Sequence, residues 1–493
     1  MQLLLQQKLS LFLANPSRRN CNIGLIFSLL FVITTFIWFL VGDFTDNKFY
    51  FLFAFVLLLA YSLFIYRISN NILFLFRFSL LLIIPLGASA SRSFFEDVLI
   101  APFGAVYQTH SATVALIASG MFSLAGSSCG WFAVFRNFNT SRNINYFQPI
   151  LSNLRLARYL TLILAYISTS LIIYAAAGFA SAEKAYATVS NSFGFQFDAL
   201  NCILFLSTAL FIIASSILNQ KYITVFYLLA PCYILPLLTG ARADFLMQLF
   251  VIVSPLLLKY SEFNSFFKRK RFLLLGLTSG VFLFYLANII VVYRAGNSLF
   301  NAIDFVFTNN IFLTIRESGT MLSIETANQM SAHFYVVYSK LQLLGEDLLY
   351  GKTYLDFIPR SIPAFFGTTR PEDLAWSMYI VKNKVMSQGG IYEVAEAYWN
   401  LGLIGSFVFP CAITFGLGVI LRIGLSYSKN WIYCFSSFIA LGLMAPRAVW
   451  YQSFAYWRLL TVFLVGFYIL KFLNFKLCSS SLPSYSNNLK MNE

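Results

Sequence analysis

The segment FAFVLLLAYSLFIY, residues 53–66, is apolar on every side, with no alternation between apolar and polar positions. A strand of an outer-membrane barrel would alternate over about ten residues, so this run is typical of a helix that crosses lipid. The chain has 493 residues, of which 59% are hydrophobic and 11% charged, with a mean hydropathy of +0.73. That composition excludes a water-soluble multidomain enzyme. We therefore predict an all-α polytopic integral membrane protein.

Similar apolar runs recur along the chain and predict about 12 transmembrane helices. We place them at 22–41, 49–66, 72–90, 111–135, 159–179, 199–218, 222–239, 245–258, 272–293, 398–421, 431–446 and 459–475. The expected organisation is an N-terminal segment (1–21), spans 1 to 9 (22–293), one long outer loop (294–396), spans 10 to 12 (397–475) and a tail (476–493).

The formal net charge of +15 is spread between the apolar runs, so it does not indicate a nucleic-acid partner. With the N-terminus inside, 20 of the 34 basic residues, Arg77 among them, fall on cytoplasmic segments, but only two of the 19 acidic residues do. Basic residues concentrate in cytoplasmic loops, so both termini are expected in the cytoplasm. Arg18 and Arg19 precede a run of about 20 apolar residues, which favours a first span over a cleaved signal.

Several kinds of chemistry have no support in the sequence. The two histidines show no paired metal-ligand spacing, and no phosphate-binding or dinucleotide-binding glycine motif follows a strand. The seven cysteines have no CxxC spacing and predict no disulfide framework. We therefore expect neither a metal nor a nucleotide cofactor.

The long outer loop at 294–396 is where we expect the function to lie, because about 103 residues are too many for a mere connection. Its first half has helix-like apolar spacing, consistent with helices on or dipping into the membrane surface. Its second half is punctuated by glycine and proline and is expected to be irregular.

Arginines gather at the predicted outer face. They are Arg242, Arg294, Arg316, Arg360, Arg370, Arg447 and Arg458. The planar fork of a guanidinium suits a diphosphate. Arg242, Arg294 and Arg447 cap different spans at one depth, so they could converge, together with Arg360, on an anionic group. The alternative is that each arginine snorkels to the interface or pairs with a neighbouring acid.

Two carboxylates stand at the start of the tenth predicted span, in GGIYEVAEAYWNLGLIG (389–405). Glu393 and Glu396 are three residues apart, which puts both on one helical face. A carboxylate at the boundary between water and lipid can act as a general base. The alternative is a solvated helix start with acids near the positive end of the helix dipole. His333 is a further candidate base, although an interfacial role suits it better.

Three motifs resemble the bacterial O-antigen polymerase (Wzy-type) family of oligosaccharide repeat-unit polymerases. They are LLTGARADF (237–245), YGKTYLDFIPRSIP (350–363) and EAYWNLGLIGSF (396–407). The resemblance places Arg242 at the family's Gly-x-Arg turn, Gly351 to Arg360 at its loop motif, and Glu396, Tyr398, Asn400 and Gly402 at the pattern before the tenth span. The run from Trp399 to Gly402 departs from the commoner Asn-Phe-Gly-like run, which leaves the role of Asn400 open.

The resemblance implies a glycosyltransferase of the bacterial inner membrane, with the long loop in the periplasm. It would move a growing glycan from undecaprenyl diphosphate onto a new lipid-linked repeat unit, making O-antigen or a related surface polysaccharide. Its partners would be lipid-linked oligosaccharides, membrane lipid and a chain-length regulator. On this reading Glu396 and Glu393 are the catalytic candidates and Arg242, Arg294, Arg360 and Arg447 bind the diphosphate. Arg316, Arg370, Arg458, Tyr398, Asn400 and His333 are further candidates.

Two alternatives stay open. An O-antigen ligase would use the same donor with a similar layout. A flippase for lipid-linked oligosaccharides would bury charges within its spans and have short loops, whereas the predicted mid-span regions here are nearly free of charge.

Overall fold

The fold is known from a computed structural model, which describes part of the chain. The described residues are 18–42, 48–69, 77–78, 81–82, 109–136, 154–177, 203–204, 207–208, 211, 227–234, 285, 289, 298–308, 322–342, 344–355 and 392–427. Every element among them is an α-helix, and four are long and apolar enough to cross a membrane. These four coincide with the spans predicted at 22–41, 49–66, 111–135 and 398–421. A multi-pass helical membrane protein is thereby confirmed, while the total of 12 spans involves residues outside the described part.

Helix α2 (Arg18–Gly42) buries one narrow stripe of side chains. The buried positions alternate in steps of three and four, which keeps them on one face of a helix: Cys21, Gly24, Ser28, Phe31, Thr35, Trp38 and Gly42. Large apolar side chains such as Leu30 and Ile37 stay exposed on the other side. In a membrane protein such a face meets lipid tails.

Helix α3 (Lys48–Ser69) returns beside α2 and is joined to it by aromatic pairs. The rings of Phe31 and Tyr61 stack with centroids 3.8 Å apart, and those of Trp38 and Tyr50 stack at 4.4 Å. The hydroxyls of Ser28 and Tyr61 are 2.8 Å apart and share a hydrogen bond. The two helices therefore form an antiparallel hairpin with the hydroxyls of Ser28 and Tyr61 buried between them.

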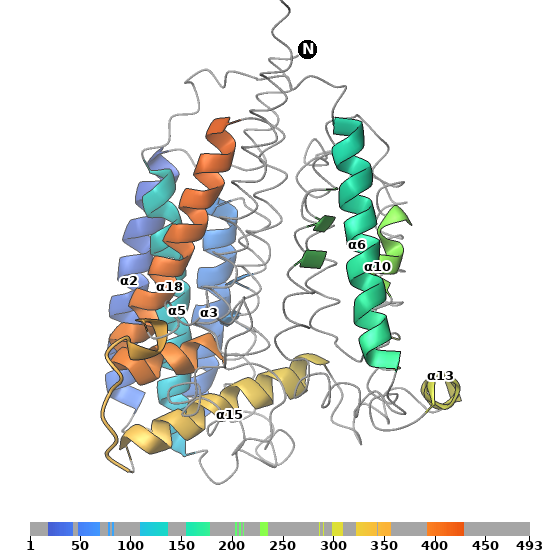
Figure 1. Cartoon of the computed structure of the whole chain (residues 1–493). Coiled ribbons are helices and arrows are strands. Elements are labelled where there is room, and N and C mark those ends of the chain that lie inside the picture. Colours follow the sequence, from blue (N-terminus) through green and yellow to red (C-terminus); the bar gives the residue numbers. More distant parts are fainter. Residues whose placement is uncertain are drawn as a thin grey trace, which may run out of the picture.

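Helix α5 (His110–Phe135) is the centre of the bundle, because its entire apolar window is buried inside the protein. It contacts α2 on one side and α18 (Glu393–Tyr427) on another (Figure 1). Small residues make this close packing feasible, as is common between membrane helices. A side chain added at Gly126 or Gly130 would run into the backbone carbonyls of Phe407 and Cys411. These two glycines, four residues apart, let α5 and α18 touch backbone to backbone.

Helix α18 consists of two segments. Its helical geometry breaks at Leu401 and Gly402, and Gly402 has φ +61° and ψ −144°, which an L side chain rarely adopts. We call residues 393–400 the short segment. The ribbon of α18 changes direction near its lower end in Figure 1. Gly405 lies so close to the carbonyl of Ala397 that a side chain there would clash, so the short segment folds back against the start of the longer one.

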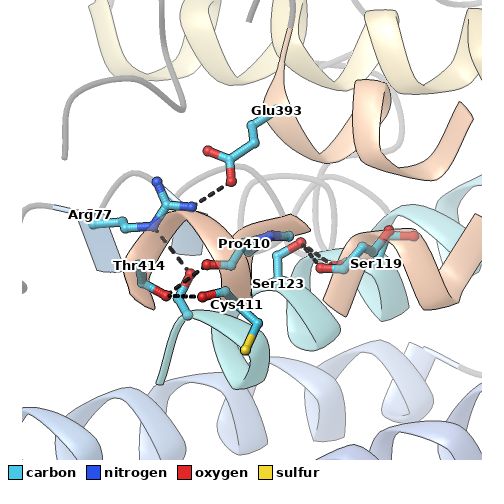
Figure 2. A network of polar contacts seen from close by, with 9 residues as sticks. Arg77, Ser119, Ser123, Glu393, Pro410, Cys411 and Thr414 are labelled. Carbon is cyan, nitrogen blue, oxygen red and sulfur yellow. Dashed lines mark hydrogen bonds and ion pairs between the residues drawn. The ribbon is translucent and has the colours of Figure 1, made fainter. Parts of the chain in front are cut away.

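Pro410 lies inside the longer segment of α18 and removes one backbone donor. In a regular helix its N–H would bond the carbonyl of Ser406, one turn earlier. The hydroxyl of Ser123 on α5 lies 2.9 Å from that carbonyl and 2.8 Å from the carbonyl of Ser119, so its one proton is shared between the two (Figure 2). A polar group left without a partner would be costly in lipid, so this bond both compensates for the proline and joins the two helices.

Two helices lie in the predicted outer loop, α13 (Leu299–Thr308) and α15 (Leu322–Gln342). This confirms the helical character predicted for the first half of 294–396. Figure 1 shows α15 running across the lower ends of the bundle rather than along it. Helix α6 (Leu154–Ala177), at the span predicted for 159–179, packs with α10 (Ala230–Ile234) and lies apart from α2, α3, α5 and α18 in Figure 1.

Candidate functional site

A buried ion pair connects the short segment of α18 to a distant part of the chain. The guanidinium Nη2 of Arg77 donates to Oε1 of Glu393, and neither side chain is exposed at all. Arg77 also donates from Nε to the hydroxyl of Ser127 on α5, at 3.1 Å. Figure 2 shows Arg77 and Glu393 pointing toward each other above the Pro410–Thr414 turn of α18. The pair therefore lies inside the bundle, between α18 and α5.

The ion pair changes the interpretation of Arg77. The charge count assigned Arg77 to the cytoplasmic segments and Glu393 to the outer side, but side chains in contact cannot belong to opposite faces of a membrane. Arg77 is fully buried inside the bundle, so the two assignments cannot both hold. The signal was present in the sequence, because an arginine five residues into a predicted span is a functional candidate by default.

Both predicted carboxylates, Glu393 and Glu396, are on the short segment and are buried, with 0% and 1% of their surface exposed. The alternative of a solvated helix start is therefore not what the structure shows. Glu393 carries its charge against Arg77, and leaving one partner of such a buried pair alone costs about 3 to 5 kcal/mol. That engagement makes Glu393 less available as a base than Glu396.

Buried polar side chains recur every four residues on one face of the short segment, beginning with the residue just before it. They are Tyr392, Glu396 and Asn400. The amide nitrogen Nδ2 of Asn400 donates to the hydroxyl of Thr353 at 2.7 Å and to the carbonyl of Glu396 at 2.8 Å. Thr353 is itself fully buried. Asn400 therefore fixes a loop residue beside the face that carries Glu396.

The loop residues 344–355 hold the end of the short segment. A helix leaves its last carbonyls without partners in the helix itself, and the break at Leu401 creates such an end. The N–H of Leu349 donates to the carbonyl of Trp399 at 3.1 Å, and the N–H of Tyr350 to that of Asn400 at 2.8 Å. The motif beginning at Gly351 and the motif around Glu396 are thus brought into direct contact, although more than 40 residues separate them.

Helix α15 covers the opposite face of the short segment. The rings of Phe334 and Tyr398 lie 4.8 Å apart, and Lys340 lies 5.4 Å from the ring centre of Trp399. His333, the third candidate base, is completely buried on the same helix. Tyr398 thus packs against α15, and its position suggests a structural contribution.

The predicted arginines all fall outside the described residues. They are Arg242, Arg294, Arg316, Arg360, Arg370, Arg447 and Arg458. The structure brings together Glu393, Glu396, Asn400 and the loop from 349 to 353, and it adds Arg77. Among the described residues, no three His, Cys, Asp or Glu side chains come together as a metal site would require.

A kinked apolar helix carries two buried carboxylates and is held by a buried arginine and by the loop 344–355. Together with the other candidate spans, this defines a multi-span membrane protein with a polar site inside its bundle. The family model of the O-antigen polysaccharide polymerase Wzy matches residues 23–478, and the chain belongs to this family. The resemblance of its motifs is thereby confirmed. No curated protein and no solved structure matches the chain significantly. The protein is a multi-pass membrane protein with the glycosyltransferase-like polymerase activity of its family.

Proposed function

We propose that the protein extends O-antigen by using a glycan linked to a polyprenyl diphosphate, undecaprenyl diphosphate, as its donor. A hydroxyl oxygen of the acceptor repeat unit forms a bond to the anomeric carbon of the growing glycan. The bond from that carbon to the diphosphate breaks, and polyprenyl diphosphate leaves. The hydroxyl proton passes to a carboxylate. This reaction draws its energy from the donor and therefore requires no nucleotide site.

The observation that carries the proposal is the position of Glu396. It is a buried carboxylate on the polar face of the short segment, next to the buried pair of Arg77 and Glu393 and one turn before Asn400. A base in such a place can accept the acceptor proton, a step that typically contributes about a hundred- to ten-thousand-fold in rate. We assign the base to Glu396 because Glu393 already serves Arg77.

The diphosphate and the membrane side belong to the same proposal. Arg242, Arg294, Arg360 and Arg447 would stabilise the negative charge on the leaving diphosphate. The excess of basic residues on the other side of the predicted spans supports an outer, periplasmic location for residues 294–396 in the inner membrane, with both termini in the cytoplasm.

Family membership favours polymerase over the two alternatives. One observation favours a flippase, which would bury charges within its spans: Arg77 and Glu393 form an ion pair buried in the bundle. Deleting the gene and separating the surface polysaccharide on a gel distinguishes the classes. A polymerase deletion leaves a single repeat unit on the lipid acceptor, whereas loss of a ligase or flippase leaves none.

Glu396→Gln tests the base, since it keeps the shape of the side chain and removes the proton acceptor. It should abolish chain extension while the protein remains in the membrane and binds its lipid-linked substrate. Glu346→Gln is the matched control, because Glu346 is an exposed acid paired with Lys340 at 2.8 Å. Long chains from Glu396→Gln, with none from Glu393→Gln or His333→Ala, would move the base to that residue. Long chains from all three would exclude a side-chain base at this site.

A further inference from the structure

Arg77 joins three parts of the molecule that are far apart in the sequence. Its guanidinium contacts Glu393, 316 residues later in the chain, and Ser127 on helix α5, whose apolar window is buried. Neither charged side chain has any exposed surface. Two charges are retained here although burying them is costly, which indicates a role that an apolar contact would not serve.

The short segment of α18 requires an anchor at its start. A continuous helix would fix the direction of these eight residues, but the break at Leu401 and Gly402 removes that constraint. The loop holds the end of the segment through backbone bonds to Trp399 and Asn400. At its other end, Glu393 is the first helical residue, and the contact with Arg77 ties it to α5 through Ser127.

We infer that Arg77 is a positioning residue for the polymerase: by holding Glu393 it fixes the start of the short segment and so orients the carboxylate of Glu396. Glu396 follows Glu393 by three residues and lies on the same face. An error of about 1 Å at a reacting group can cost about a hundredfold in rate. This inference rests on the proposed role of Glu396.

Arginine suits this task better than lysine. Two different nitrogens of the guanidinium serve Ser127 and Glu393, Nε for the hydroxyl and Nη2 for the carboxylate. A lysine has a single nitrogen on a flexible stem and does not reproduce this rigid fork. Arg77→Lys should therefore keep the charge but hold the short segment less firmly.

The test compares Arg77→Lys, Arg77→Gln, Glu393→Gln and the double variant Arg77→Gln/Glu393→Gln, with Glu346→Gln as the control. Each protein is purified and placed in lipid vesicles. The substrate is the lipid-linked single repeat unit extracted from a strain that lacks the polymerase. The kcat and the KM for this substrate are measured, and unfolding is followed by the loss of monodisperse protein on heating.

Arg77→Gln should lower kcat about a hundredfold with little change in KM, because it misplaces a catalytic group without removing a contact to substrate. Arg77→Lys should lie between this variant and the wild type. The double variant should be about as slow as Arg77→Gln, because the contact that holds the short segment is already lost in the single variant. A double variant whose loss in kcat equals the product of the two single losses, or an Arg77→Gln protein with wild-type kcat, overturns the inference.

The heating experiment separates this inference from the proposed function. If Arg77 and Glu393 act as a pair, their single losses of thermal stability are not additive in the double variant. Coupled losses without any kcat effect would mean that the pair is only structural and would overturn the positioning role. Coupled losses and a kcat effect together with an active Glu396→Gln would refute the base assignment, and the pair would then act through Glu393 itself rather than by orienting Glu396.

Discussion

Replacing Gly126 with alanine should push α5 and α18 apart. An added Cβ would meet Cα of Phe407 at 3.2 Å and its carbonyl carbon at 3.0 Å, with the carbonyl oxygen nearer still. The obstacle is backbone on both sides, so no side chain can rotate away. We expect the two helices to separate by about 1 Å, and a gap of that size forfeits about a quarter to a half of the dispersion energy of each contact.

The magnitude follows from a matched substitution. Overpacking typically costs about 1 to 3 kcal/mol. Alanine also stabilises a helix over glycine by about 1 kcal/mol, which would hide part of that cost. Gly416→Ala carries the same propensity gain on α18, but its added Cβ meets nothing within 4 Å. The difference in free energy of unfolding between the two variants therefore measures the cost of overpacking at the close contact of the helices, about 1 to 3 kcal/mol.

The assay measures apparent melting temperature in detergent and the polysaccharide ladder made in cells. Gly126→Ala should melt below Gly416→Ala and should make shorter chains, because α18 also carries the short segment. An equal or higher melting temperature for Gly126→Ala would refute the packing of α5 on α18 described above.

Three further predictions concern other parts of the chain. Gly402→Ala should lower the free energy of unfolding by about 1 to 3 kcal/mol and reduce chain extension. The reason is the positive φ of Gly402, since an added Cβ would meet nothing within 4 Å. A melting temperature equal to that of Gly416→Ala would contradict this prediction. Neutral replacement of a diphosphate-binding arginine should lower donor use about ten- to two-hundred-fold, and lysine should not fully restore it. The arginines to vary are Arg242, Arg294, Arg360 and Arg447, and wild-type ladders from all four alanine variants at equal expression would remove them from the site. A single cysteine at Lys382, with the native cysteines removed, should be labelled by an impermeant reagent in intact spheroplasts; protection would overturn the proposed orientation.

The membrane helices could be predicted from the sequence because a span is a local property. A run of apolar residues about 20 long must bond its own backbone in lipid, whatever surrounds it. The bounds of the spans predicted at 49–66 and 111–135 accordingly differ from those of α3 and α5 by no more than a few residues. The helical nature of α15 was likewise visible in its apolar spacing.

The contacts of the site could not be predicted in the same way, because they join residues far apart in the chain. Nothing local in the sequence pairs Arg77 with Glu393, or Asn400 with Thr353. The break at Leu401 was also missed, since the apolar run continues across it and one glycine in a membrane helix is ordinary. The place of Glu396 near the membrane boundary of a span stays a prediction, and its burial could not be predicted because it depends on tertiary packing.

The central claim is that this protein joins repeat units by displacing a polyprenyl diphosphate. Purified protein in lipid vesicles, supplied with lipid-linked single repeat units from a strain lacking the polymerase, tests it most directly. We expect a ladder of longer lipid-linked glycans and the release of a polyprenyl diphosphate for each new linkage, with neither from Glu396→Gln. A ladder that forms without release of polyprenyl diphosphate, or no ladder from correctly folded wild-type protein, would contradict the account.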